Sequence, residues 1–108
     1  MLRRTAFLAA TMIAAFVTHS LAADAESEFS GRRIAETNCA VCHAISLDDR
    51  SENPDAPPFR LLTRSRGLAA LRTDMAGDLF RRHPEMPDFE PTPKQLDDIV
   101  NFIGSISQ

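Results

Sequence analysis

The chain contains no tryptophan and no tyrosine, a single lysine and only two cysteines among its 108 residues. Because there is no third cysteine, a zinc site made of four thiolates is excluded. The formal net charge is −3, so the chain also lacks the basic balance of nucleic-acid-binding domains. Hydrophobic residues make up 44% and charged residues 25%, which is ordinary for a soluble globular protein, and the length predicts one domain.

The beginning of the chain is typical of an export signal. A positively charged start is followed by an uncharged apolar run over residues 6–17, which is too short to span a bilayer comfortably. Small residues come next, and they predict cleavage between residues 22 and 25. The alternative is a retained membrane anchor. We therefore expect residues 1–23 to be a signal peptide, residues 24–108 to be the mature domain, and the location to be the periplasm.

The most informative stretch is residues 39–43, which read Cys-x-x-Cys-His. Two thiols at this spacing can each add to one vinyl group of a haem, and the histidine that follows can bind the iron. Three other interpretations compete: a thioredoxin-like redox pair, half of a zinc site, and a structural disulfide in an exported protein. No βαβ pattern is visible around the motif, and zinc would need further ligands. The motif therefore favours one covalent haem c attached to Cys39 and Cys42, with His43 as an iron ligand.

A methionine between two prolines is the best candidate for the second iron ligand. Met86 lies in residues 83–89, where the prolines hold the backbone extended and display its side chain. Met75 recurs at helical spacing, where a methionine more often fills a core. The rival is His83, which would give bis-histidine ligation and a lower potential, whereas a thioether favours ferrous iron and raises the potential.

A run of two prolines supplies a further candidate for the site. Residues 56–59 read Ala-Pro-Pro-Phe, which predicts a stiff, extended segment. The carbonyl of Pro57 can then accept a hydrogen bond from the outer N–H of His43 and fix its tautomer. The alternative is an ordinary loop proline.

The first two helices of the mature chain are expected from local signals. Residues 24–30 are polar and predict a loose segment, and a short helix is expected over residues 28–38. Apolar residues at helical spacing predict a second helix over residues 67–76, with Gly77 ending or bending it.

The last helix has the clearest signals. Thr92 and Gln95 form a predicted capping box, and a proline occupies the first helical position. Asp97 and Asp98 are expected to face outward near the helix start. The apolar stripe of this helix comprises Leu96, Ile99, Val100, Ile103 and Ile106.

With these features together, the chain resembles the small bacterial class I monohaem cytochromes c of periplasmic type. The resemblance covers nearly all of the mature chain. It is carried by Gly31, by Cys39-x-x-Cys42-His43, by residues 56–59, by residues 83–89 and by residues 98–103. It implies an all-α fold of three to four helices around one covalent haem, with the N- and C-terminal helices crossing at Gly31 and Phe102 packed there.

The resemblance also implies roles for individual residues. Cys39 and Cys42 would carry the thioether bonds, and His43 and Met86 would be the axial ligands. The Pro57 carbonyl would be the hydrogen-bond partner of His43.

Two features depart from the resemblance. No tryptophan or tyrosine is present to bond a haem propionate, and Arg60, Arg64 or Arg66 could replace that interaction. Lys94 is the only lysine, so the lysine ring that mitochondrial cytochromes use for docking is absent.

The function implied is one-electron transfer between periplasmic redox proteins by a monomer that is not an enzyme and that meets the membrane only transiently through redox complexes. One alternative is a haem protein that binds small gases after displacing Met86. Another is a cytochrome subunit of a larger oxidoreductase complex. A third is a haem-free interaction domain with a disulfide between Cys39 and Cys42.

Overall fold

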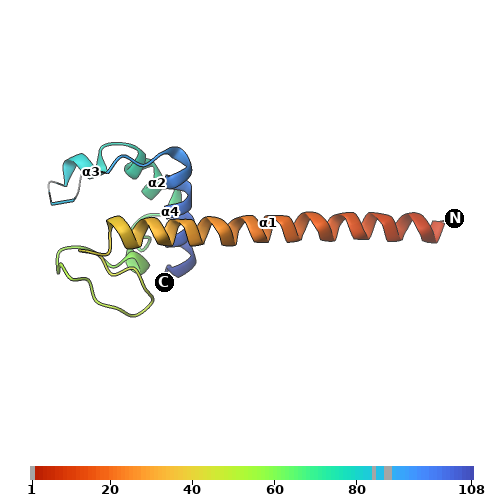
Figure 1. Cartoon of the computed structure of the whole chain (residues 1–108), viewed down its shortest axis with the longest axis horizontal. Helices are drawn as coiled ribbons and strands as arrows, with labels where there is room; N and C mark the ends of the chain where they lie inside the picture. Colours follow the sequence, from red (N-terminus) through yellow and green to blue (C-terminus); the bar gives the residue numbers. More distant parts are fainter. Residues whose placement is uncertain (1, 84, 87–88) are drawn as a thin grey trace.

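The computed structural model describes residues 2–83, 85–86 and 89–108, with side chains from residue 20 onward. Within these ranges the chain forms four α-helices, one 3-10 helix and no strand (Figure 1). The elements follow in the order α1 (Leu2–Asn38), η1 (Phe59–Leu61), α2 (Leu68–Ala76), α3 (Leu79–Arg82) and α4 (Pro93–Ile106). The predicted all-α class is confirmed. None of the described helices combines the length and the apolar character needed to cross a bilayer.

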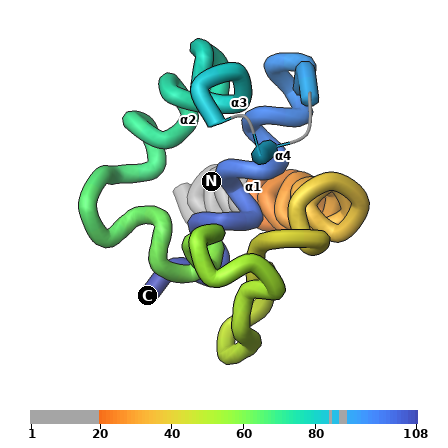
Figure 2. The backbone as a smooth tube through the Cα atoms, turned by 90° about the vertical axis from the view of Figure 1, so that its left-hand side faces the viewer, coloured from red at the N-terminus to blue at the C-terminus, as the bar shows by residue number. Residues whose placement is uncertain are grey.

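The core is built where α1 crosses α4 (Figure 2). Gly31 of α1 is buried at this crossing, and a Cβ placed there would lie 1.9 Å from the carbonyl oxygen of Asp98. Ala35 and Ile103 are 0% exposed. Because no side chain separates the two helices at residue 31, their backbones make direct contact. Phe102 is buried in the same core cluster.

The first helix is longer than the sequence predicts. Residues 24–30 are helical and belong to α1, so the expected loose segment and the expected start near Glu28 are both wrong. No glycine or proline occurs before Gly31, so no residue in this stretch breaks the helix. Ser27 lies inside the helix, where its hydroxyl donates to Oδ1 of Asp98 at 2.7 Å. This hydrogen bond ties the polar segment to α4.

Asp98 also differs from expectation. Asp97 is exposed as predicted and pairs with Arg72, but Asp98 is only 5% exposed. Its carboxylate accepts hydrogen bonds from Ser27 and from Lys94, the latter at 2.8 Å. Burial favours the neutral carboxyl, but these hydrogen bonds and the lysine charge outweigh it and hold the pKa of Asp98 below its ordinary value.

The start of α4 and the bounds of α2 agree with the sequence predictions. The Thr92 hydroxyl accepts from the Gln95 N–H at 3.2 Å, and the Gln95 side chain accepts from the Thr92 N–H at 2.8 Å. This is the predicted capping box. Gly67 precedes α2, and Gly77 ends it by donating its N–H to the carbonyls of the last turn.

Two segments lie on opposite sides of the α1–α4 pair. In Figures 1 and 2, α2 and α3 lie on one side and the loop over residues 44–58 lies on the other. The loop is closed by the Phe59 N–H, which donates to the Ala44 carbonyl at 2.9 Å. Arg60 then donates to the Asp49 carbonyl at 2.8 Å. These hydrogen bonds hold the 44–58 loop in place on its side of the α1–α4 pair.

Candidate functional site

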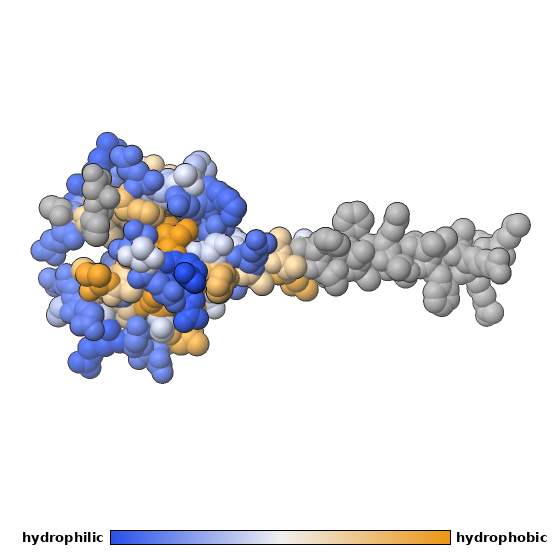
Figure 3. All heavy atoms as spheres, in the orientation of Figure 1, coloured by the Kyte–Doolittle hydropathy of each residue, from blue (hydrophilic) through white to orange (hydrophobic). Residues whose placement is uncertain are grey.

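A pocket of about 650 Å³ opens between the loop and the α2–α3 segment. This volume falls in the range of roughly 300–1,000 Å³ that small-molecule and cofactor sites occupy. Figure 3 shows hydrophobic residues reaching the surface on this part of the molecule between hydrophilic margins. The apolar residues that line the pocket include Leu62, Leu71, Met75, Leu79, Phe80, Phe89 and Ile103. The pocket is therefore shaped for a large apolar molecule.

The Cys-x-x-Cys-His motif forms one wall of this pocket. The Cys39 N–H still donates to the Ala35 carbonyl at 2.8 Å, so the motif starts as an extension of α1. The chain then turns, because the N–H groups of Cys42 and His43 both donate to the Cys39 carbonyl, at 3.1 and 2.9 Å. Cys39, Cys42 and His43 all line the pocket as a result. Burial raises the pKa of the Cys39 thiol to about 11, so this sulfur is held as the neutral thiol.

His43 is oriented by the proline run. Its Nδ1 lies 2.7 Å from the Pro57 carbonyl oxygen, which is the contact expected from the sequence. Since a carbonyl only accepts, Nδ1 carries the proton and Nε2 of the neutral ring keeps a free lone pair. The ring also packs against Phe59, with 5.4 Å between the ring centres. His43 is thus held in the tautomer that a metal ligand requires.

Met86 lines the pocket as well. It is half-buried and lines the same pocket as His43. The two prolines that were predicted to hold it extended, Pro84 and Pro87, lie outside the described residues. Met75 is 8% exposed and belongs to the core cluster, although it also contributes to the pocket wall. The structure therefore brings together both cysteines, His43 and Met86 around one space.

The three arginines considered for a propionate lie in different places. Arg60 is bound to the 44–58 loop, where it also pairs with the Asp49 carboxylate at 3.6 Å. Arg64 is exposed and is not part of the pocket wall. Arg66 lines the pocket and pairs with Asp74 of α2, which lines it too. Of the three, Arg66 is the one that reaches the site.

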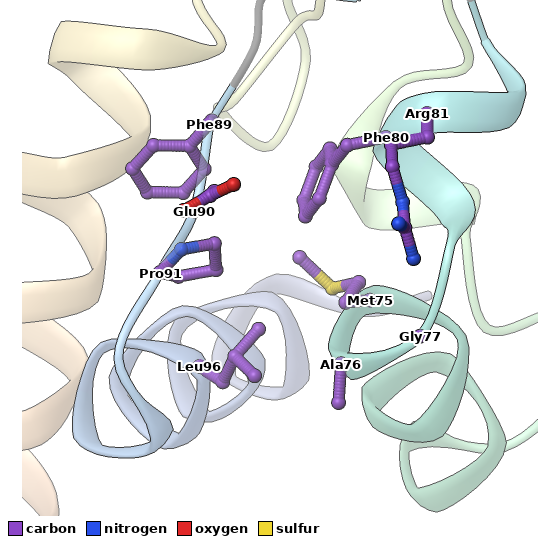
Figure 4. Close-up of a pocket in the computed structure, with 9 residues that line it drawn as sticks. All are labelled: Met75, Ala76, Gly77, Phe80, Arg81, Phe89, Glu90, Pro91 and Leu96. Atoms are coloured by element: carbon purple, nitrogen blue, oxygen red, sulfur yellow. The ribbon is translucent and has the colours of Figure 1, made fainter.

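A second, smaller pocket of about 280 Å³ adjoins the first. Figure 4 shows Phe80 and Phe89 facing one another above Met75, with Leu96 of α4 below. The two phenyl rings meet edge to face, with 5.8 Å between their centres. Met75, Phe80 and Phe89 line both pockets. These three apolar side chains therefore border both pockets.

The residues present fit a covalent haem. Many of the lining side chains are apolar, and the same lining contains the two cysteines, the His43 imidazole and the Met86 thioether, the last two being groups that can bind iron. Cys39 and Cys42 are free thiols and form no disulfide. In the described part of the chain, no three His, Cys, Asp or Glu side chains gather closely enough to hold a metal ion, so the zinc interpretation has no ligand set there.

Sequence reasoning missed two contacts at this site. The first is the hydrogen bond between His83 Nδ1 and the Leu79 carbonyl, at 2.7 Å. Its only sequence signal is the four-residue spacing typical of a helix end. The second is the ion pair of Arg66 with Asp74, which joins the segment before α2 to the helix itself. No local signal announces it, because the two residues meet only through the turn at Gly67.

Comparisons with known proteins identify the family of this chain. The family model described as Cytochrome c matches residues 30–107. A "Cytochrome c-552" of Bradyrhizobium diazoefficiens is 30% identical over 94 residues, which cover 87% of this chain and 86% of that protein. A "Cytochrome c-553-like" protein of Synechocystis sp. is 28% identical over 91 residues, which cover 84% of this chain and 79% of that protein. No solved structure gives a significant match.

Proposed function

The chain belongs to the cytochrome c family, and from this we propose that it is a periplasmic one-electron carrier with His43 and Met86 as axial ligands of its haem iron. The observation that carries the proposal is a single pocket whose lining includes Cys39, Cys42 and His43 of the attachment motif together with Met86. The haem c of this family supplies an iron that takes up and releases one electron. We assign no bond-making reaction to the protein.

The proposal gives each site residue a task. Cys39 and Cys42 would each form one thioether bond, and the cofactor would then stay bound without full enclosure. The Nε2 atom of His43 would be the proximal donor, and its hydrogen bond to Pro57 would strengthen it as a ligand. Met86 would supply the distal thioether, which stabilises ferrous iron relative to ferric iron.

The surroundings would tune the potential further. Apolar walls keep water from the site and disfavour the extra positive charge of ferric iron, which raises the potential. Arg66 is the best placed of the arginines to pair with a propionate, since it lines the pocket and Arg64 does not. Its ion pair with Asp74 would orient the guanidinium toward that edge.

The partners would be periplasmic redox proteins, approached by a monomer. The exposed edge of the site supports this, because Val41 lies between the two cysteines and is 77% exposed. An apolar side chain at that place offers a partner a small dry contact beside the attachment point. A role as the cytochrome subunit of a larger oxidoreductase is the alternative.

One experiment tests the proposal. The full chain is expressed in a bacterial host with a cytochrome c maturation system, and the periplasmic product is weighed by mass spectrometry and titrated with an electrode. We expect a chain that has lost about 23 residues and gained one haem, with a one-electron titration curve and low-spin spectra in both oxidation states. A product without covalent haem would overturn the electron-carrier proposal. A ferrous protein that binds carbon monoxide rapidly would favour the gas-binding alternative instead.

A further inference from the structure

Two iron-ligand side chains lie on one turn at the edge of the pocket. α3 ends at Arg82, and His83 is its C-cap residue. The Met86 N–H donates to the His83 carbonyl at 2.9 Å, so the two residues close a single tight turn. Both side chains line the same pocket as His43. The turn thus offers an imidazole and a thioether from nearly the same backbone position.

The imidazole of His83 is prepared in the same way as that of His43. Its Nδ1 lies 2.7 Å from the Leu79 carbonyl, and the corresponding distance between His43 Nδ1 and the Pro57 carbonyl is also 2.7 Å. In each neutral ring the proton is on Nδ1, and Nε2 is left as a donor for a metal. An ordinary surface histidine has no such constraint.

The two side chains differ in burial, and this difference indicates which of them would bind the iron first. Met86 is half-buried in the pocket wall, whereas His83 is exposed at its margin. Under the proposed ligation, the less exposed thioether would be the resting ligand, and the exposed imidazole would lie outside it. Arg82, the neighbour of His83, is occupied on its own helix by an ion pair with Asp78 at 2.9 Å.

We propose that His83 is a reserve axial ligand that binds the haem iron whenever Met86 leaves it. This inference rests on the proposed His43 and Met86 ligation. The exchanged state has two imidazoles on the iron and a lower potential, because the thioether no longer favours ferrous iron. It keeps the iron six-coordinate, so small molecules find no open position while Met86 is displaced.

The first experiment removes the resting ligand in the mature holoprotein. In Met86→Ala, His83 takes the vacant position, and we expect a low-spin ferric spectrum with bis-histidine signals in electron paramagnetic resonance. The equilibrium constant for reduction falls at least tenfold, which is about 59 mV for one electron. The double variant Met86→Ala/His83→Ala becomes high-spin and binds carbon monoxide in the ferrous state. Arg81→Ala, a change two residues before His83 at a side chain outside the lining of this pocket, keeps the wild-type spectrum.

A second experiment leaves Met86 in place, in case its variants fail to mature. Guanidinium below the unfolding midpoint is used to loosen the turn in the ferric wild type and in His83→Ala. If residues 1–23 are removed, His83 is the only histidine besides His43. We expect a low-spin form with nitrogen ligation in the wild type and a high-spin form in the variant.

The possible results separate this inference from the proposed function. A high-spin Met86→Ala that binds carbon monoxide like the double variant overturns the reserve ligand and leaves the resting ligation intact. Identical guanidinium spectra for wild type and His83→Ala overturn it as well. A wild type that is already bis-histidine overturns both the resting ligation and the reserve role.

Discussion

The α1–α4 crossing and the haem-facing pocket bury apolar side chains to different extents. At the crossing, Ile99 and Ile103 are 1% and 0% exposed, and the backbones touch at Gly31. Around the pocket, Leu79, Phe80 and Phe89 are only partly buried although they pack against the same core. The crossing is closed by protein alone, whereas the pocket leaves apolar surface that protein does not cover.

This difference shows how a small domain can be stable with little core of its own. A chain of this size buries a limited share of its surface and often depends on a metal, a disulfide or a cofactor. Here the helices meet at one end, and the pocket side would be completed by covalent haem. The four predictions below act on one region or the other.

The largest effect is expected from removing both attachment points. In Cys39→Ala/Cys42→Ala the pocket cannot hold a covalent group, so its apolar walls stay exposed to water and cooperative unfolding is lost. Circular dichroism melting curves and the protein mass measure this. The single variants serve as controls, since each retains one thiol. A double variant that unfolds as sharply and at the same temperature as the wild type would show that the pocket side needs no cofactor.

The next effect concerns the crossing itself. In Gly31→Ala the new methyl would meet the Asp98 backbone, which cannot rotate away as a side chain can. We expect the free energy of unfolding to fall by about 3 kcal/mol, at the upper end of overpacking effects, while the visible spectrum of the surviving protein stays unchanged. Gly67→Ala is the matched control. Nothing lies within 4 Å of a Cβ there, so a loss of only about 0.5 kcal/mol is expected.

A smaller effect is expected at the buried carboxylate. Because the pKa of Asp98 is lowered in the folded protein, its stabilisation is complete above the ordinary Asp pKa of about 3.9 and is lost as the pH falls through the lower folded value. In Asp98→Asn we expect a loss of about 1–2 kcal/mol at neutral pH that disappears in strong acid. Guanidinium unfolding across this pH range measures it.

The control for Asp98 is its neighbour. Asp97→Asn removes an exposed pair with Arg72 and is expected to change the free energy of unfolding by less than about 1 kcal/mol. If both variants lose the same stability at every pH, the buried network around Asp98 does not stabilise the crossing as we infer.

The smallest effect is expected at the pocket edge. Arg66→Gln removes a positive charge that favours ferrous iron, so the potential falls, by less than the ~59 mV of a tenfold change, because Arg66 is about half exposed. Arg64→Gln is the control, since Arg64 lies off the pocket wall. Equal potentials for both variants and the wild type would show that Arg66 does not act on the haem.

Local signals in the sequence predicted the elements whose causes are local. The capping box at Thr92 and the glycines around α2 need only neighbours in the chain, and the structure has them where they were expected. The expected start of the first helix near Glu28 was wrong because polar residues alone do not end a helix, and no glycine or proline interrupts the chain before Gly31. The hydrogen bond that ties this polar segment to α4 joins Ser27 to Asp98, 71 residues away, and leaves no local signal. A polar segment with no such partner could equally be a loop.

The candidate site residues could be selected from the sequence because their chemistry is specific, whereas the contacts around them could not. Cys39, Cys42, His43 and Met86 are rare residue types in this chain, so spacing and composition select them. The burial of Asp98 had one usable signal: Phe102 comes four residues later and shares its helix face. The hydrogen bond between His83 and the Leu79 carbonyl had almost no sequence signal, because every residue has a backbone carbonyl.

The unbroken course of α1 has a consequence if residues 1–23 are the signal peptide that the sequence predicts. Cleavage between residues 22 and 25 would cut through a helix, at a point just before Ser27. The trimmed helix would then open with Asp24, Glu26 and Glu28 in its first turns, where the helix dipole attracts negative charge. Cleavage would therefore remove a basic N-terminal segment and leave an acidic one. Ser27, which bonds Asp98 of α4, would then lie within two turns of the new amino terminus.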